Sequence, residues 1–378
     1  MRHEQRELAA AAAAVDAPDV VFALSRDGRR TVVSGGSRPP PAGGREHLRY
    51  EIGSATKVFT GLLLAHLAQQ GLVDPADTAS SLLTRPHPGP PATPRRAGAG
   101  AGVGTGVGAV TLTHLATHTS ALPRLPYDFY PQALPRWSSQ PYAGYGTDRL
   151  VGAFLRSRPL RRPGTRWHYS NFGVSVLGHA LGAATATTWP DLLTRQILRP
   201  LALHETRLHP EQAEHPGQAE HPEQAGTGAP GGAGAAGAAG AVRDAVGYRA
   251  DGVTPVPGLQ AAGFGPAGAV RATPADLLTF LEAHATPAGS PLEAALTAVH
   301  HPVLRRGRRH REEHTLTWFR HPGAAGPFCF HAGATSGQQA FLGFQPATGT
   351  ALAAVCTRRF RRGDTLVSGA YALLAAQH

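Results

Sequence analysis

Segments with the pattern of β-strands lie at both ends of this chain, and segments with the pattern of helices lie between them. Near the start, two β-prone runs flank an Asp27-Gly28 turn within residues 20–33, which predicts a β-hairpin. Further short β-prone runs, separated by Gly- and Pro-rich turns, lie at 315–320, 328–332, 339–344 and 351–357. Short links favour antiparallel pairing. We therefore expect an α+β fold whose antiparallel sheet is built from both termini and flanked by helices, with a mostly helical region inserted in the middle.

Two low-complexity stretches interrupt the helical part of the sequence. Residues 86–109 and 209–240 are rich in Pro, Gly and Ala, and the second stretch opens with a tandem repeat that contains His-Pro and Gln-Ala. Segments of this composition cannot build a core, and the prolines argue against a fixed metal site at the repeated histidines. We predict that both are inserts in a helical domain over 85–264, and that 1–84 and 265–378 together form the sheet domain.

Helical periodicity predicts the remaining elements. Besides an amphipathic N-terminal helix, helices are expected over 54–70, within 110–120, over 148–155, 171–181 and 189–198, from Thr273 onward, and over 366–376. The helix over 54–70 carries a broad apolar stripe and has Gly71 as its stop signal. We expect this helix to be buried, with Ser54 at its N-terminus.

The charge of the chain admits a nucleic-acid partner but does not require one. The net charge is +11, and arginines cluster at 305–311 and 358–362. Apart from Phe360, no aromatic residue interleaves these clusters, and they lie on no recognisable nucleic-acid module. We therefore expect the clustered arginines to lie in solvated loops, and we expect no nucleic-acid partner.

The ends of the chain and its cysteines bear on the cellular location. No apolar run is long enough to span a bilayer. The first residues mix acids with bases before a short alanine run, which favours a helix over a signal peptide and predicts a cytoplasmic protein. Cys329 and Cys356 match neither a disulfide framework nor a zinc site, so we expect two buried, reduced thiols. We expect no cofactor and no metal.

One lysine stands among the 36 basic residues, and it is Lys57. Arginine is always protonated, whereas a buried lysine amine can have its pKa lowered and take part in proton transfer. Ser54 lies three residues earlier, so the two side chains share a helix face and form a candidate activated nucleophile. The alternative is that Lys57 is an ordinary helix residue.

Two more segments carry candidate chemistry. Tyr169 and Asn171 stand together at a helix start; a phenol near cations can lose its proton, and an amide can bind substrate. His331 and Gly333 stand on a predicted strand, where a glycine lets a substrate backbone approach closely. The amide of Ala334 could complete an oxyanion hole with that of Ser54. Taken alone, the tyrosine is more often structural and the histidine is more often a turn residue.

Three short motifs in this order resemble those of the serine β-lactamase and penicillin-binding-protein superfamily. They are Ser54-x-x-Lys57, Tyr169-x-Asn171 and His331-x-Gly333. The middle motif is similar to that of the class C branch, which includes class C β-lactamases, D-alanyl-D-alanine carboxypeptidases and related esterases. The stretch 112–123 is similar to one that usually ends in Thr-Ser-Gly-Leu-Pro. The resemblance extends from about Val20 to Leu374, without the two low-complexity stretches.

The resemblance implies a role for each of these residues. Ser54 would be acylated while Lys57 and Tyr169 move protons, and the amides of Ser54 and Ala334 would hold the oxyanion. Substrate would be bound by Asn171, His331 and Gly333. His118 would be structural.

The chain departs from the pattern of the resemblance at the third motif. His331 and Ala332 stand where lactamases have Lys and Thr, and Ala121 stands where Gly is usual. Loss of the cation weakens recognition of the carboxylate that penicillins and acyl-D-Ala peptides carry. We therefore expect a serine hydrolase acting on a small ester or amide. The alternatives are a β-lactamase or D-alanyl-D-alanine carboxypeptidase, and a catalytically silent scaffold that binds a ligand; the oligomeric state stays open.

Overall fold

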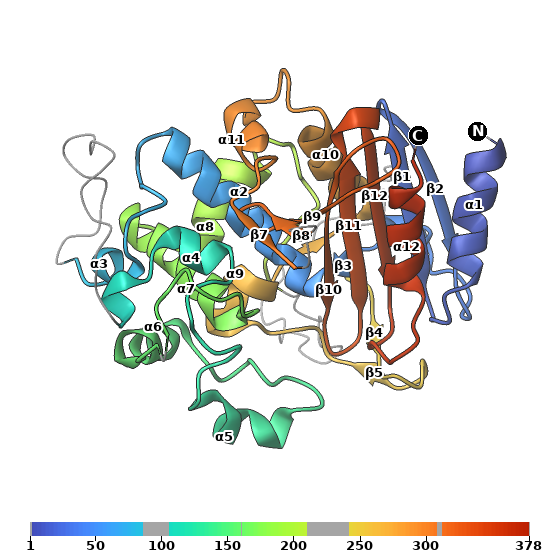
Figure 1. Ribbon diagram of the computed structural model, residues 1–378. Helices are drawn as coiled ribbons and strands as arrows, with labels where there is room; N and C mark the ends of the chain where they lie inside the picture. Colours follow the sequence, from blue (N-terminus) through green and yellow to red (C-terminus); the bar gives the residue numbers. More distant parts are fainter. Residues whose placement is uncertain (1, 86–105, 160, 210–241, 308–311, 378) are drawn as a thin grey trace, which may run out of the picture.

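The computed structural model describes residues 2–85, 106–159, 161–209, 242–307 and 312–377. Within these residues a large antiparallel sheet stands beside a group of helices (Figure 1). Its strands follow the order β2-β1-β12-β11-β10-β9-β8-β7. Their bounds are β1 (Val20–Arg26), β2 (Arg29–Gly35), β7 (Leu304–Arg306), β8 (Glu312–His314), β9 (Phe319–His321), β10 (Phe328–Ala334), β11 (Gln339–Gln345) and β12 (Thr350–Cys356).

The first strand of the chain pairs with the last one. Val20 of β1 lies opposite Cys356 of β12, and the antiparallel register continues along both strands. The hairpin between β1 and β2 turns at Asp27 and Gly28, whose φ values of 49° and 79° are those of a tight hairpin turn. The prediction of an α+β fold with a sheet built from both termini is confirmed.

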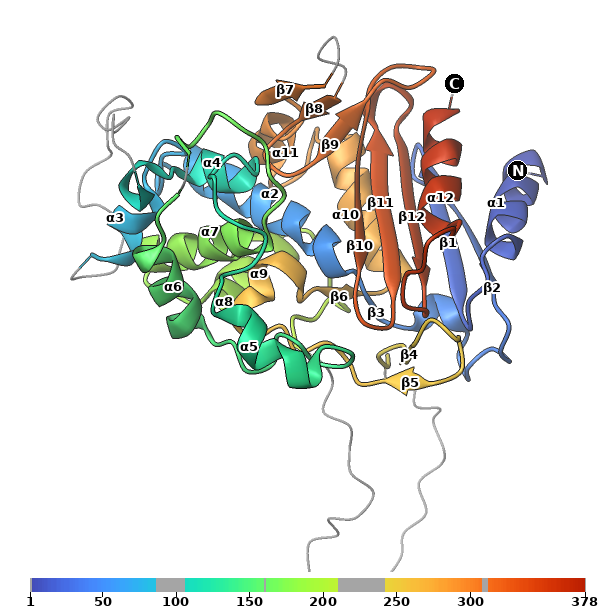
Figure 2. The same cartoon turned by 60° about the horizontal axis from the view of Figure 1, so that its bottom comes forward.

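Helices cover both faces of the sheet (Figure 2). Val21 and Ala23 join a hydrophobic cluster that includes α2 and α10, whereas Val20 and Phe22 join a second cluster with α1 and α12. This division follows from the strand geometry, because successive side chains point to opposite faces. The covering helices are α1 (Arg2–Ala13), α10 (Pro274–Ala285) and α12 (Leu366–Ala375), and all three agree with the predicted segments.

Helix α2 (Thr56–Gln69) runs between the sheet and the other helices (Figures 1 and 2). Every residue from Thr56 to Ala65 is buried, so the apolar surface is wider than the predicted stripe. The helix begins two residues later than predicted, because Gly53–Ala55 forms a 3-10 turn. Ser54 therefore lies in a tight turn immediately before the first residue of α2.

The remaining helices pack against α2 and against one another. They are α3 (Ala79–Leu83), α4 (Leu112–Ala116), α5 (Phe129–Ala133), α6 (Thr147–Arg156), α7 (Asn171–Ala184), α8 (Trp189–Leu193), α9 (Gly265–Gly268) and α11 (Glu293–Ala298). Two small ribbons complete the described elements, β3 (Tyr50–Glu51) with β6 (Arg271–Ala272) and β4 (Gly247–Tyr248) with β5 (Pro255–Val256). One hydrophobic cluster runs from the sheet into these helices, so the division into domains 1–84 with 265–378 and 85–264 stays a prediction.

Several sequence predictions fall on residues outside the described ranges. These include most of the two low-complexity stretches, the tandem repeat, and part of the first arginine cluster. Cys329 and Cys356 are both buried and are not joined in a disulfide, as expected. Among the described residues, no helix combines the length and apolarity required to cross a membrane.

The C-terminal part of the sheet differs from the prediction in two ways. The strand expected over 315–320 covers only Phe319–His321, because the Thr315 amide donates to the Trp318 carbonyl in a turn. Strands β7 and β8 were not predicted, since each is three residues long and strongly charged.

The prediction that the clustered arginines lie in solvated loops is wrong for several of them. Arg305 and Arg306 lie on β7 and form ion pairs with Glu313 and Glu312 across to β8. Arg358 is buried, and its guanidinium contacts the carboxylates of Asp16 and Asp364. Ion pairs with acidic side chains therefore hold these charges within the fold.

Candidate active site

The Ser54 turn touches strand β10 backbone to backbone. A Cβ atom added to Gly333 would lie 1.9 Å from the carbonyl oxygen of Ile52 and 2.8 Å from the amide nitrogen of Ser54. A Cβ added to Gly53, whose φ is 49°, would lie 2.6 Å from the carbonyl oxygen of Ala334. Both positions therefore require glycine, and their contact brings the amides of Ser54 and Ala334 to one place.

This contact corrects the expectation for Gly333. The sequence predicted that the missing side chain makes room for a substrate backbone. In the structure, the Ile52 carbonyl and the Ser54 amide fill that room. Gly333 thus shapes the nucleophile turn, and it does not provide the substrate-contacting surface that was expected.

A cavity of about 270 Å³ opens where the turn meets β10. Ser54, Asn171 and Ala334 all line it, although they come from three segments far apart in the sequence. Aromatic side chains form much of the rest of the wall, namely Phe129, Trp137, Tyr142 and Phe264. The cavity therefore presents a hydroxyl, backbone amides and an amide side chain within a wall that mixes polar and aromatic surface.

Lys57 lies one helical turn beyond Ser54 and is completely buried. Its ammonium nitrogen donates a hydrogen bond to the Ala267 carbonyl, 3.0 Å away, and stands 5.0 Å from the centre of the Tyr169 ring. Burial, together with the nearby charge of Arg124, holds the pKa of Lys57 well below that of an ordinary lysine. The lowered pKa favours the neutral amine, which can accept a proton.

The Ser54 side chain lies close enough to the Tyr169 phenol to act on its pKa. Burial raises the pKa of the phenol to about 12, against the opposing effects of the Ser54 side chain and the Arg124 charge. From the sequence, neighbouring cations were expected to favour loss of the phenol proton. Desolvation outweighs those cations, so Tyr169 rests as a neutral phenol.

Asn171 is the first residue of α7, and hydrogen bonds of Ser170 hold the segment before it in place. The Ser170 hydroxyl accepts from the Gly173 amide and donates to the Pro123 carbonyl, 2.6 Å away. The Ser170 amide donates to Nδ1 of His118, and this bond helps to fix the backbone between Tyr169 and Asn171. The Asn171 side chain lies near the Tyr142 phenol, and its Oδ1 atom is buried and has no partner among the described residues. That oxygen is free to accept a hydrogen bond.

His331 does not reach the cavity. Its side chain is 1% exposed, and its Nδ1 donates to the Ala332 carbonyl, 2.8 Å away. Burial lowers the pKa of His331 to about 3, so the ring is neutral. The expectation that His331 contacts substrate is therefore not met, because the strand turns its ring into the interior.

Two cations at the cavity were not identified from the sequence. Arg124 lines the cavity and stands over the Tyr169 ring, 5.8 Å from the ring centre to the guanidinium carbon. Arg359 lines the cavity as well, from the loop after β12. Neither arginine stands in a recognisable motif. The sequence pointed to Arg124 only through its position directly after the family-like stretch that ends at Pro123.

The sequence of the chain is similar to that of a known protein family and of one of its characterised members. A family model described as Beta-lactamase matches residues 6–377. The chain is 31% identical over 167 residues to the D-alanyl-D-alanine-carboxypeptidase/endopeptidase AmpH of Escherichia coli (strain K12). That match covers 42% of this chain and 36% of AmpH, so it spans about a third of the relative's own length.

Solved structures share the fold over almost the whole chain. A class C β-lactamase in complex with cefoxitin superposes with a TM-score of 0.72 at 18% identity, covering 99% of this chain and 98% of that chain. A D-stereospecific amidohydrolase from Streptomyces sp. superposes with a TM-score of 0.67 at 20% identity, covering 95% and 94%. These likenesses show that the chain has the fold of class C β-lactamases.

Proposed function

Because the chain belongs to the β-lactamase family, we propose that it is a serine hydrolase that forms an acyl-enzyme on Ser54. The observation that carries the proposal is that the Ser54 hydroxyl lies beside the Tyr169 phenol, whose ring stands 5.0 Å from the buried Lys57 amine of lowered pKa. A serine hydroxyl needs such an activating partner, because its own pKa is far too high for attack at neutral pH.

The proposed reaction proceeds in two halves. In the first, the Ser54 oxygen attacks the acyl carbon, its proton passes to the neutral amine of Lys57, and the amides of Ser54 and Ala334 hold the oxyanion. The phenol of Tyr169 then protonates the leaving group and regains a proton from Lys57. In the second half, water attacks the ester formed on Ser54, which releases the acid and restores the hydroxyl.

The cavity lining supports a small ester or amide as substrate. Aromatic rings suit an apolar or aromatic acyl group, and the free Oδ1 of Asn171 suits an amide N–H on the acyl side. Buried, neutral His331 supplies no cation for a carboxylate. We therefore place neutral esters and amides first.

A second candidate is the hydrolysis of a β-lactam or of an acyl-D-alanine peptide. AmpH is named as a carboxypeptidase, and one structural neighbour is a class C β-lactamase with bound cefoxitin. Arg124 and Arg359 line the cavity and could pair with a substrate carboxylate in place of the missing lysine. The cytoplasmic location stays a prediction that bears on this choice, since it would separate the protein from cell-wall substrates.

A panel of activated substrates tests the proposal. Wild type, Ser54→Ala and Ser336→Ala would be assayed with p-nitrophenyl esters, p-nitroanilides and a chromogenic cephalosporin, and labelled with a fluorophosphonate probe. Ser336 lines the same cavity, so Ser336→Ala is the matched control. We expect turnover and labelling in wild type and the control, and neither in Ser54→Ala.

The substrates separate the remaining alternatives. Turnover of esters and anilides without the cephalosporin supports the first candidate, and the reverse supports the second. Labelling that persists in Ser54→Ala contradicts the mechanism. Ligand binding with no turnover of any substrate would favour the catalytically silent scaffold.

A further inference from the structure

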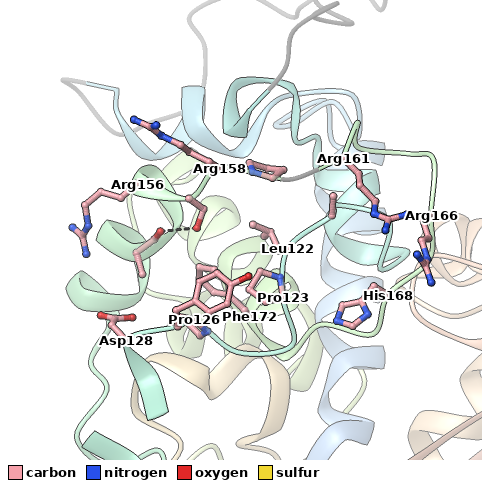
Figure 3. Close-up of a pocket in the computed structure, with 15 residues that line it drawn as sticks. Leu122, Pro123, Pro126, Asp128, Arg156, Arg158, Arg161, Arg166, His168 and Phe172 are labelled. Carbon is pink, nitrogen blue, oxygen red and sulfur yellow. Dashed lines mark hydrogen bonds between the residues drawn. The ribbon is translucent and has the colours of Figure 1, made fainter. Parts of the chain in front are cut away.

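A second cavity, larger than the catalytic one, lies beside the Tyr169 segment, since His168 and Phe172 both line it (Figure 3). Its volume is about 710 Å³, within the range of small-molecule sites. No residue lines both cavities. The two are separated by the segments that carry the catalytic wall, since Pro123 and His168 face the second cavity while Arg124 and Asn171 face the first.

The second cavity is strongly cationic. Figure 3 shows Arg161, Arg166 and His168 at one end, and at the other two further arginines, Arg156 and Arg158. Within the described part of the chain, no carboxylate forms an ion pair with any of the four arginines.

One acid, Asp128, lines the cavity, but its carboxylate already has hydrogen-bond and ion-pair partners. Asp128 accepts from the Tyr145 phenol at 2.5 Å and from the guanidinium of Arg149 at 3.2 Å. These contacts lower the pKa of Asp128, so it stays ionised and paired with groups outside the cavity. The four guanidinium groups are therefore free to bind an anion from solution.

The floor between the two cationic ends is apolar. Leu122 and Phe172 are buried beneath it, and Pro123 and Pro126 continue the same surface (Figure 3). Tyr127 also lines the cavity and is 77% exposed. An exposed aromatic residue beside an apolar floor favours a flat hydrophobic body.

We propose that this cavity binds a small anion that has an apolar, preferably aromatic, body and a phosphate or carboxylate head. The body lies on the Leu122–Phe172 floor, and the head pairs with Arg161 and Arg166. Bidentate guanidinium contacts favour such oxyanions over neutral groups of the same size. The site is separate from the one that hydrolyses substrate, so its occupant is an effector and is not consumed.

The walls shared by the two cavities connect this site to catalysis. The Phe172 amide donates to the Arg124 carbonyl, and the His168 amide donates to the His118 carbonyl at 2.7 Å. A ligand that contacts Phe172 and His168 therefore bears on the same short segment that positions Tyr169 and Asn171. Occupancy should change the rate at Ser54 through these contacts.

Titration calorimetry with three matched naphthalene probes tests the site. We would use 1-naphthyl phosphate, 1-naphthoate and neutral 1-naphthol, each with wild type, Ser54→Ala, Arg161→Ala/Arg166→Ala, and the control Arg6→Ala/Arg29→Ala. Arg6 and Arg29 are exposed on α1 and β2, at the far side of the sheet, and their removal changes the net charge equally. Thermal melts would establish that the variants fold.

We expect both anions to bind wild type and the control at least tenfold more tightly than 1-naphthol does. In Arg161→Ala/Arg166→Ala the preference for the anions over 1-naphthol should fall about tenfold. Tighter binding of 1-naphthyl phosphate than of 1-naphthoate would identify phosphate as the preferred head group, and the reverse would identify carboxylate. Binding should persist in Ser54→Ala, which keeps this result independent of the proposed reaction. Equal anion affinity in the double variant and its control, or no preference for the anions over 1-naphthol, would overturn the proposal.

A kinetic measurement tests the connection to catalysis. In wild type, a saturating amount of the tighter anion should change kcat for a neutral p-nitrophenyl ester at least twofold, and the double variant should lose this response. A purely competitive rise in KM, with kcat unchanged in wild type, would instead place the anion in the catalytic cavity and overturn the assignment.

Discussion

Gly333 of β10 lies so close to Ile52 that a Cβ atom on the glycine would sit 1.9 Å from the Ile52 carbonyl oxygen. Real Cβ atoms do not approach a carbonyl oxygen this closely, so any side chain at 333 would push the nucleophile turn away from the strand. The proposed oxyanion hole depends on this contact, because it needs the amides of Ser54 and Ala334 side by side.

Gly333→Ala should therefore reduce activity sharply. A shift of about 1 Å in a catalytic group costs on the order of a hundredfold in rate. Forcing the extra carbon into the packed contact should also lower the free energy of unfolding by about 1–3 kcal/mol. Gly35→Ala is the control, because a Cβ at Gly35 would meet nothing within 4 Å. Ester turnover and thermal melts of both variants check the expectation, which fails if Gly333→Ala keeps the activity of Gly35→Ala.

The pH dependence of the reaction should reflect the buried amine of Lys57. Only the neutral amine accepts the Ser54 proton, so kcat/KM should fall as the pH is lowered through the pKa of Lys57, which lies well below 10.5. Because the pKa of Tyr169 is raised to about 12, no loss from phenol ionisation is expected below that range.

Arg124→Met provides the matching test of this assignment. The Arg124 charge lowers the pKa of Lys57, so its removal should move the acidic limb of the profile to higher pH. Profiles of kcat/KM for a neutral ester in both proteins measure the shift. An acidic limb that stays in place, or moves to lower pH, contradicts the assignment to Lys57.

Arg359→Ala should distinguish substrates by charge. Arg359 lines the catalytic cavity, so its removal should raise KM about tenfold for an ester that carries a carboxylate and leave a neutral ester unchanged. Arg362→Ala, on the same exposed loop, is the control. His331→Gln should not discriminate between the two esters, because the ring does not reach the cavity. A carboxylate-selective effect of His331→Gln would restore the role predicted from sequence.

A buried ion pair supports the wall of the catalytic cavity. Arg271 pairs with Glu51 at 2.9 Å and also donates to the Leu259 carbonyl at 2.8 Å, while Glu51 accepts from the Leu259 amide. Arg271→Met leaves a buried carboxylate without its cation, which costs about 3–5 kcal/mol of unfolding free energy.

The exposed pair of Arg305 with Glu313 offers the contrast. Arg305 is largely exposed and Glu313 keeps a second partner in Arg320, so Arg305→Met should cost about 0–1 kcal/mol. Urea unfolding of the two variants measures the difference. Similar midpoints would show that burial does not strengthen the Arg271 pair.

Much of the fold could be predicted from local patterns. Runs of β-prone residues bounded by turn residues predicted the hairpin at Asp27-Gly28 and most of β10 to β12, and helical periodicity predicted α2 and α10. Strands β7 and β8 were missed because each has only three residues, most of them charged, and so contains no β-prone run. Arg358 was misplaced because the fold buries it between Asp364, which is close in the sequence, and Asp16, which lies near the other end of the chain.

The sequence by itself determined which residues carry the candidate chemistry: a lone lysine three positions after Ser54, and Tyr169 at the start of a helix. Only the tertiary structure decided how they are used. It turned His331 inward, made Gly333 a contact for the nucleophile turn, and set the neutral state of Tyr169 by burial. Local patterns specify which side of an element is apolar, whereas distances and desolvation arise only when remote segments pack together.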